Sequence, residues 1–203
     1  PAPAHQPAQG PAPTRCLLPT AARQHPESTN PTPPPGIPAN VQAHLVQNRE
    51  LYTLVTDTLA IWGVDRKQLT LEITESAVIE DINAGFDNLQ SLKDYGVKLS
   101  IDDFGTGYSS LSYFKQIPAH ELKIDKSFVQ NMLEDEQDQH LVRLIINLAR
   151  LFQLRVVAEG IEDEATYEFL KKLGCHYGQG SYIAKPMPAD AFIAWLQARE
   201  EAA

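Results

Sequence analysis

Short apolar runs alternate with amphipathic stretches from residue 39 to residue 198, and this alternation limits the possible folds more than any other feature. The runs match buried strands, whereas the stretches between them have the three- and four-residue spacing of helices. Such alternation predicts an α/β fold, in which helices cover a parallel sheet. The predicted strands are residues 39–41, 69–73, 97–102, 121–125, 154–159 and 175–181, and the predicted helices are residues 45–62, 81–95, 139–152, 164–173 and 189–198.

Polar residues lie late in most of the predicted strands. In a (β/α)8 barrel the C-terminal ends of all strands open onto one face, whereas a doubly wound sheet gathers such residues at one crevice. Their spread over five strands favours a TIM-type (β/α)8 barrel, but only about six βα units are present, so we expect an incomplete barrel. The late-strand residues are Glu72, Asp102, Asp103, Lys123, Glu159 and Gln179.

Residues 1–38 differ in composition from the rest of the chain. They contain 12 of the chain's 15 prolines, no aromatic residue and no lysine, and Glu27 is their only acid. Such a segment cannot bury enough apolar surface to offset its chain entropy. We predict a disordered or polyproline-like segment at 1–38, or alternatively an aberrant, frame-shifted N-terminus. A folded domain at 39–198 and a short tail at 199–203 follow it.

The net charge of −9 argues against binding to a nucleic acid polymer, because a grip on the phosphate backbone requires a basic surface. Cys16 and Cys175 are isolated thiols, as is typical of a reducing compartment. No apolar run approaches the roughly 18 residues that span a bilayer, and no signal-peptide core is present. The composition predicts a cytoplasmic protein, or the cytoplasmic part of a larger signalling protein, with no membrane segment in this chain.

Asp102 and Asp103 end an apolar strand, and a loop with Gly105 and Gly107 follows them. Two adjacent carboxylates repel each other unless a cation or a proton compensates their charge. The two glycines allow backbone angles with which the loop can fold close over a ligand. On this stretch alone, a strand followed by an ordinary Asp/Gly turn remains an equal alternative.

Asn40, Glu72, Asp102 and Asp103 would offer oxygen ligands around one mouth of the barrel. Oxygen ligands suit Mg²⁺, Mn²⁺ or Ca²⁺ better than zinc, and the six histidines form no zinc-binding pattern. Several acids with Lys123 as their one cation imply bound metal ions, most simply two. Two metal ions suit the attack of an activated water on a phosphodiester. Lys123 could then orient or deprotonate that water, or stabilise the charge that develops on phosphorus. A capping or surface role remains the alternative for each acid taken singly.

Two further patterns predict structural roles. Asp125 is the predicted N-cap of a helix, since Lys126, Ser127 and Phe128 follow it. The helix at 139–152 carries an apolar stripe, which we expect to be core rather than an interaction face. The stripe consists of Leu141, Leu144, Ile145, Leu148 and Leu151.

Five motifs, in order and spacing, resemble the EAL-domain cyclic di-GMP phosphodiesterases. The resemblance runs from about Asn40 to Trp195 and implies a modified (β/α)8 barrel that needs Mg²⁺ or Mn²⁺ and linearises cyclic di-GMP to pGpG. The motifs are EITES at 72–76, DDFGTGYSSL at 102–111, LKID at 122–125, VAEGIE at 157–162 and QG at 179–180.

The resemblance also implies a role for each matching residue. Asn40, Glu72, Asp102 and Asp103 fall on metal-ligand positions of a two-metal site. Lys123 falls on the water-activating lysine, Glu159 on the last acid of the site, and Gln179 on a residue that orients a water. Glu75 matches the anchor of the loop after Asp103, which in the family couples metal binding to dimerisation through a neighbouring helix, and Glu162 is a further site acid. The residues on the substrate and dimer loop are Phe104, Gly105, Thr106, Gly107, Tyr108 and Ser109.

Two departures from the family pattern affect the prediction. Gln42 stands where the family has a serine after Asn40, and the Glu-Ala-Leu motif, whose glutamate is a metal ligand, occurs nowhere in residues 1–203. Glu27 is no plausible substitute, so we expect the first part of the barrel to be missing and the chain alone to have little or no activity. The alternatives are a degenerate EAL module that binds cyclic di-GMP or a protein partner without hydrolysis, and a truncated product without stable function. The retained Glu72, Asp102, Asp103 and Lys123 favour descent from an active enzyme.

Overall fold

A single sheet of seven strands forms the centre of the computed structural model, which describes residues 16–17, 37–79, 82–106 and 114–201. The strand order is β1-β7-β6-β5-β4-β3-β2. Every neighbouring pair from β2 to β7 is parallel, which confirms the predicted α/β fold, whereas β1 runs antiparallel to β7. The strands are β1 (Cys16–Leu17), β2 (Ile37–Val41), β3 (Leu69–Thr74), β4 (Lys98–Phe104), β5 (Glu121–Ile124), β6 (Arg155–Ala158) and β7 (Tyr177–Gly178).

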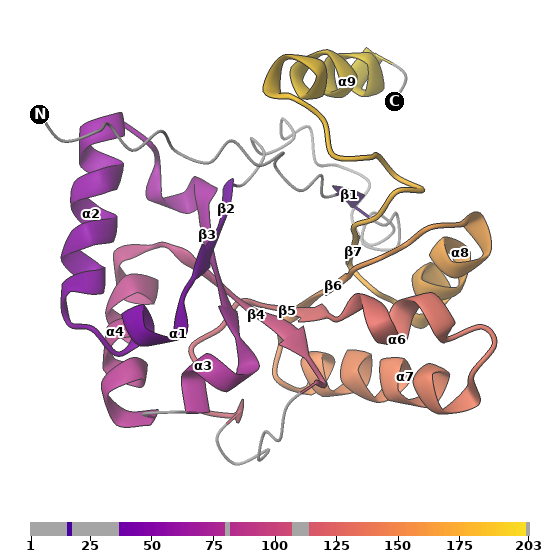
Figure 1. The fold of residues 1–203 in the computed structure, drawn as a ribbon, viewed down its shortest axis with the longest axis horizontal. Coiled ribbons are helices and arrows are strands. Elements are labelled where there is room, and N and C mark those ends of the chain that lie inside the picture. Colours follow the sequence, from indigo (N-terminus) through magenta and orange to yellow (C-terminus); the bar gives the residue numbers. More distant parts are fainter. Residues whose placement is uncertain (1–15, 18–36, 80–81, 107–113, 202–203) are drawn as a thin grey trace, which may run out of the picture.

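The helices form two groups beside the sheet (Figure 1). The first group, α1 to α4, lies beside β2 to β4, and the second, α6 to α8, lies beside β5 to β7, while α9 lies apart (Figure 1). Within the described ranges, no helix combines the length and apolar character that crossing a membrane requires. The helices are α1 (Ala43–Val46), α2 (Glu50–Trp62), α3 (Glu75–Ile79), α4 (Ile82–Tyr95), α6 (Lys126–Asn131), α7 (Glu136–Leu151), α8 (Glu164–Leu173) and α9 (Ala189–Glu201), with a 3₁₀ turn at Arg66–Gln68.

The two faces of the sheet differ in polarity because side chains alternate along each strand. One face packs against the helices in two apolar clusters, to which β4 contributes Leu99 and Ile101 and β5 contributes Leu122 and Ile124. The opposite, inner face carries the alternate residues, several of which are polar although they are buried. They include Thr70, Glu72, Ser100, Glu121 and Lys123.

The described sheet is open at both ends. Among its strands, β1 and β2 are the two ends of the order and are not paired with each other. β1 lies inside the segment that we expected to be disordered or polyproline-like. Cys16 and Leu17 fall between Pro13 and Pro19, so their backbone N–H groups are available for pairing with β7. The remaining residues of that segment, 1–15 and 18–36, lie outside the described residues.

Several predicted boundaries shift in the structure. The predicted helix at 45–62 is divided into α1 and α2, and the last predicted strand shortens to β7. Helix α7 begins earlier than predicted because the Asp135 side chain accepts hydrogen bonds from the backbone N–H groups of Gln137 and Asp138. The core prediction for the α7 stripe is wrong for Leu144 and Leu151, whose exposed fractions are 63% and 75%.

We expect Asp163→Ala to lower the free energy of unfolding by about 1 kcal/mol, measured by urea denaturation. The Asp163 side chain accepts hydrogen bonds from the backbone N–H of Thr166 at 2.8 Å and from its hydroxyl at 3.1 Å, so it caps α8. Glu164→Ala, one residue further on, is the matched control and should cost less than about 0.5 kcal/mol. Equal effects of the two substitutions would contradict the capping role.

Candidate active site

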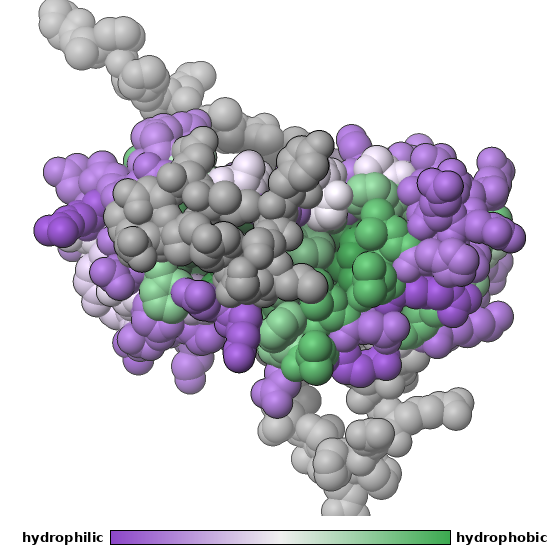
Figure 2. All heavy atoms as spheres, turned by 90° about the horizontal axis from the view of Figure 1, so that it is seen from below, coloured by the Kyte–Doolittle hydropathy of each residue, from purple (hydrophilic) through white to green (hydrophobic). Residues whose placement is uncertain are grey.

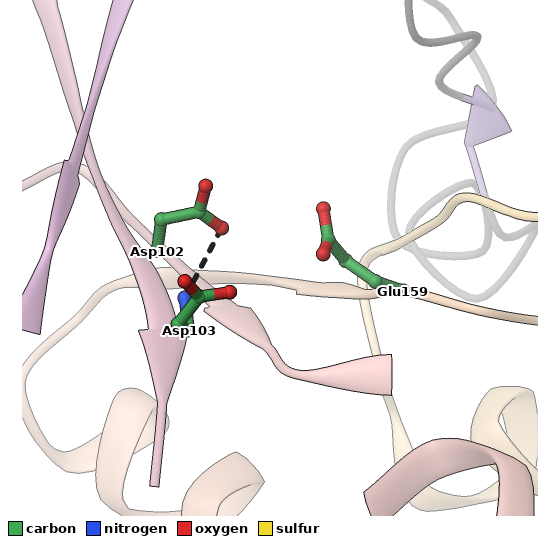
Figure 3. A group of neighbouring side chains, drawn as sticks. All are labelled: Asp102, Asp103 and Glu159. Atoms are coloured by element: carbon green, nitrogen blue, oxygen red, sulfur yellow. Dashed lines mark hydrogen bonds between the residues drawn. The ribbon is translucent and has the colours of Figure 1, made fainter. Parts of the chain in front are cut away.

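A bulge near the end of β4 brings two consecutive carboxylates to the same region. In a regular strand Asp102 and Asp103 would point to opposite faces of the sheet. The register between β4 and β5 shifts between Ile101 and Phe104, and Asp103 adopts a left-handed backbone with φ of 53°. Both carboxylates then lie toward the space that Glu159 faces, and the Asp103 N–H donates to Asp102 Oδ1 at 3.1 Å (Figure 3). A strained backbone at paired acids is typical of a functional site.

Lys123 lies among three of the predicted site acids. Its Nζ is 2.7 Å from Glu159 Oε1, 2.8 Å from Asp102 Oδ1 and 3.2 Å from Glu72 Oε2. Burial alone would lower the pKa of Lys123, but the carboxylates of Glu159, Glu72 and Asp102 outweigh it and raise that pKa above its ordinary value. The carboxylates therefore favour the charged ammonium form on the inner face of the sheet.

The carboxylates outnumber this ammonium group. Burial raises the pKa of Asp103, and the negative charges of Asp102 and Asp125 raise it further. Burial likewise raises the pKa of Glu159, although Lys123 opposes the shift. The site therefore holds an excess of negative charge that a bound cation would relieve.

The donor atoms fit a metal ion. Asp102, Asp103 and Glu159 each offer an oxygen, and these oxygens lie within 4.8 Å of one another (Figure 3). An all-oxygen donor set suits Mg²⁺, Mn²⁺ or Ca²⁺. Gln179 directly follows β7 at the strand end next to Glu159, and its Oε1 is buried without a hydrogen-bond partner among the described residues. A buried acceptor of this kind favours a water or ligand at the site, since leaving it unpaired costs about 1–3 kcal/mol.

The remaining predicted metal residue, Asn40, lies on strand β2 in register with Glu72. Paired residues of parallel strands project to the same face, so both belong to the inner face of the sheet. Glu72 is buried whereas Asn40 is exposed, because β2 is an end strand of the described sheet. The structure thus gathers Glu72, Asp102, Asp103, Lys123 and Glu159, with Asn40 beside them at the open end.

The loop after Asp103 is tied to the start of α3. Glu75 Oε2 accepts a hydrogen bond from the backbone N–H of Gly105 at 3.0 Å, which is the contact that the family resemblance implies. Gly105 has a φ of 100°, an angle that favours glycine. Phe104 packs against Phe114 with ring centroids 5.0 Å apart, and the Thr106 hydroxyl donates to the Asp103 carbonyl at 2.8 Å. The predicted loop residues Gly107, Tyr108 and Ser109 lie outside the described residues.

Glu162 and Asp125 have surroundings that the sequence did not predict. Glu162 accepts a hydrogen bond from Gln130 Nε2 at 2.6 Å on an exposed surface, outside the group of clustered carboxylates found among the described residues. Asp125 does cap α6, where it accepts from the backbone N–H of Ser127 at 2.9 Å, but its charge also acts on Asp103. Its position directly after β5, the same late-strand position as the other acids, was the sequence signal for this second role.

The comparisons with known proteins agree with this geometry. The EAL domain family model matches residues 4–186. The chain is 40% identical over 162 residues to the oxygen sensor protein DosP of Escherichia coli, with 80% of this chain and 20% of the relative covered. It is 42% identical over 158 residues to the bifunctional diguanylate cyclase/cyclic di-GMP phosphodiesterase MucR of Pseudomonas aeruginosa, with 78% of this chain and 23% of the relative covered. The chain therefore spans about a fifth of the length of these relatives.

A solved structure of the MucR phosphodiesterase in complex with c-di-GMP is similar in fold as well as sequence. The TM-score is 0.75 and the identity 42%, over 77% of this chain and 64% of the other. This likeness confirms the predicted TIM-type class for the described sheet and helices. Motifs, fold and family match therefore agree that the chain belongs to the EAL-domain family.

Proposed function

We propose that this chain is part of a metal-dependent phosphodiesterase that hydrolyses cyclic di-GMP to pGpG. The observation that carries the proposal is the buried Lys123, whose Nζ lies within 3.2 Å of three carboxylates at the C-terminal ends of barrel strands. The relative MucR, which is named as a cyclic di-GMP phosphodiesterase, and its c-di-GMP complex support the choice of substrate.

The proposal includes Mg²⁺ or Mn²⁺ at the carboxylates, in two sites as in the family. Asn40, Glu72, Asp102 and Asp103 would hold the ions, with Glu159 beside them. Bound there, the ions would supply an activated water and neutralise charge on the phosphodiester.

Lys123 keeps in this proposal the roles that the sequence suggested. The carboxylates of Glu159, Glu72 and Asp102 by themselves raise its pKa. Beside bound ions, Lys123 would orient or deprotonate the attacking water, or stabilise charge on a phosphoryl oxygen. Gln179, whose Oε1 is buried and unpaired among the described residues, would accept a hydrogen bond from that water.

A second function, binding of cyclic di-GMP without hydrolysis, is favoured by one sequence observation. The Glu-Ala-Leu motif does not occur in residues 1–203, so one metal ligand of the family is not supplied by these residues. Metal-dependent binding needs fewer correctly placed ligands than catalysis does, because catalysis depends on the geometry of the attacking water.

We further propose a homodimer through the loop after Asp103 and the neighbouring helix α7. The side of the molecule that carries α7 shows a hydrophobic area at its surface (Figure 2). On this helix, the side chains of Leu144 and Leu151 are exposed, with exposed fractions of 63% and 75%. Exposed apolar areas of this kind commonly mark protein interfaces.

To test the function, the purified chain is incubated with cyclic di-GMP and Mg²⁺ or Mn²⁺, with pGpG followed by chromatography and binding by calorimetry. We expect metal-dependent binding, little turnover, and a loss of affinity of at least about tenfold in Asp102→Asn, equivalent to about 1.4 kcal/mol. Asp57→Asn on the exposed face of α2 is the matched control. Robust turnover that Glu72→Ala abolishes would refute the expected inactivity, and absence of both binding and turnover would refute the proposed function.

Asp103→Asn should raise the melting temperature in EDTA and remove the stabilisation that Mn²⁺ gives the parent chain. The pKa of Asp103 is raised in the folded state, so its carboxylate opposes folding at neutral pH and an amide relieves that repulsion. Asparagine also tolerates the left-handed backbone at this position. Thermal scans with and without Mn²⁺ measure both effects, and a lower melting temperature in EDTA would contradict the repulsion.

Leu144→Glu should convert a dimer into a monomer in size-exclusion chromatography with light scattering, because it places a charge in the proposed interface. Leu54→Glu on α2 is the matched control, since the exposed fraction of Leu54 is 56%, close to that of Leu144. A parent chain that is monomeric at high concentration would overturn the proposed dimer.

A further inference from the structure

Two histidines occupy equivalent places at the end of the sheet opposite the carboxylates. His120 directly precedes β5, and His176 directly precedes β7. Three residues after each histidine comes a site residue, Lys123 on β5 and Gln179 after β7. Each histidine is therefore at the start of a strand whose other end supplies the site.

His120 connects β5 to both neighbouring strands. Its Nδ1 accepts a hydrogen bond from the backbone N–H of Leu99 in β4 at 3.1 Å, and its own backbone N–H donates to the Leu99 carbonyl at 2.9 Å. Its carbonyl accepts from the backbone N–H of Arg155 in β6 at 3.0 Å. The imidazole thus replaces a backbone acceptor where the ladder between β4 and β5 begins.

His176 makes the same kind of contact between the start of β7 and strand β6. Its Nδ1 accepts a hydrogen bond from the backbone N–H of Val156 in β6 at 3.1 Å. Cys175 Sγ, immediately before it, lies 3.3 Å from the Tyr177 carbonyl and 3.7 Å from the Val156 carbonyl, and its one hydrogen can be donated to either. The His176 ring is therefore the side chain that binds the Val156 amide at the start of β7.

An imidazole can accept these hydrogen bonds only while it is neutral, because both ring nitrogens of the imidazolium are donors. Lys93 of α4, Arg155 of β6 and Lys98 of β4 act on His120, with Glu121 of β5 as the opposing carboxylate. Arg150 of α7 and Arg155 act on His176. Burial first and these cations second lower the pKa of both histidines, which keeps them neutral near pH 7.

We propose that His120 and His176 are pH-sensitive positioning residues, whose neutral rings bind the starts of β5 and β7 to β4 and β6 and whose protonation in mild acid releases them. The release loosens the strands that place Lys123 and Gln179. The consequence for the active site rests on the proposed function. The contacts between the histidines and the strands do not depend on it.

The sign of the pH dependence follows from the direction of the shifts. A histidine whose pKa is lower in the folded state stabilises the fold above its unfolded pKa of about 6.5, and this stabilisation is lost as pH falls toward and through the folded pKa. Between the unfolded and the folded pKa, the equilibrium that favours the bound neutral ring weakens by up to about tenfold per pH unit, and below the folded pKa this loss levels off. The fraction of molecules in which the two histidine contacts are open should therefore rise as pH falls.

Amide hydrogen exchange of the full chain between pH 7 and pH 5 tests the proposal. Protection factors, corrected for intrinsic exchange, should fall at the Leu99 and Val156 amides as pH falls below about 6.5, by up to about tenfold per pH unit until each folded pKa is reached. Nitrogen chemical shifts should show Nδ1 of both rings unprotonated at pH 7. Unchanged protection between pH 7 and pH 5, or a protonated Nδ1 at pH 7, would overturn the proposal.

Asparagine variants separate the pH effect from simple loss of packing, because Asn Oδ1 can replace Nδ1 as an acceptor and does not titrate. His120→Asn should remove the pH dependence at Leu99 while Val156 keeps it, and His176→Asn should do the reverse. His140→Asn, on the exposed side of α7, should change neither amide. A pH dependence that persists in both Asn variants would refute the positioning role, whether or not the chain proves to bind cyclic di-GMP.

Discussion

The contact of Lys123 with Glu72, Asp102 and Glu159 is the interaction on which the inner face of the sheet depends. These residues come from β3, β4, β5 and the end of β6, so one ammonium group joins four consecutive strands at their C-terminal ends. Removing one partner of such a buried pair leaves an uncompensated charge, typically at a cost of about 3–5 kcal/mol. The fold and the site therefore share one electrostatic centre.

The same region also holds groups that oppose folding. Asp103 has a left-handed backbone and lies close to the like charges of Asp102 and Asp125. Proteins retain strain and repulsion of this kind where a ligand relieves them. Asp102 and Glu159 contact Lys123 and also form the candidate metal group with Asp103, so one ammonium group shares more carboxylates than it can compensate. This excess of negative charge explains how one cluster can be both a structural centre and a candidate metal site.

The sequence predicted most elements of the fold and missed features that depend on their surroundings. Spacing located the strands that became β3 to β6, and the predicted helix end at residue 62 agrees with α2, which ends at Trp62 before Gly63 with its left-handed φ of 63°. The stripe on α7 was predicted to be core, yet Leu144 and Leu151 are exposed, because helical spacing identifies an apolar side without identifying what covers it. Asp125 was predicted only as a cap, because its effect on Asp103 depends on the pairing of β5 with β4.

The sequence by itself determined the alternation of strands and helices, the late-strand position of each site residue and the motifs of the EAL-domain family, since all of these are local patterns along the chain. Only the tertiary structure decided which of those residues meet. The order and register of the strands bring Lys123 to three carboxylates, turn Asp103 toward Asp102, and set His120 and His176 against the amides of Leu99 and Val156. The physical reason is that these contacts join residues distant in sequence, and strand pairing rather than local spacing sets the distances between them.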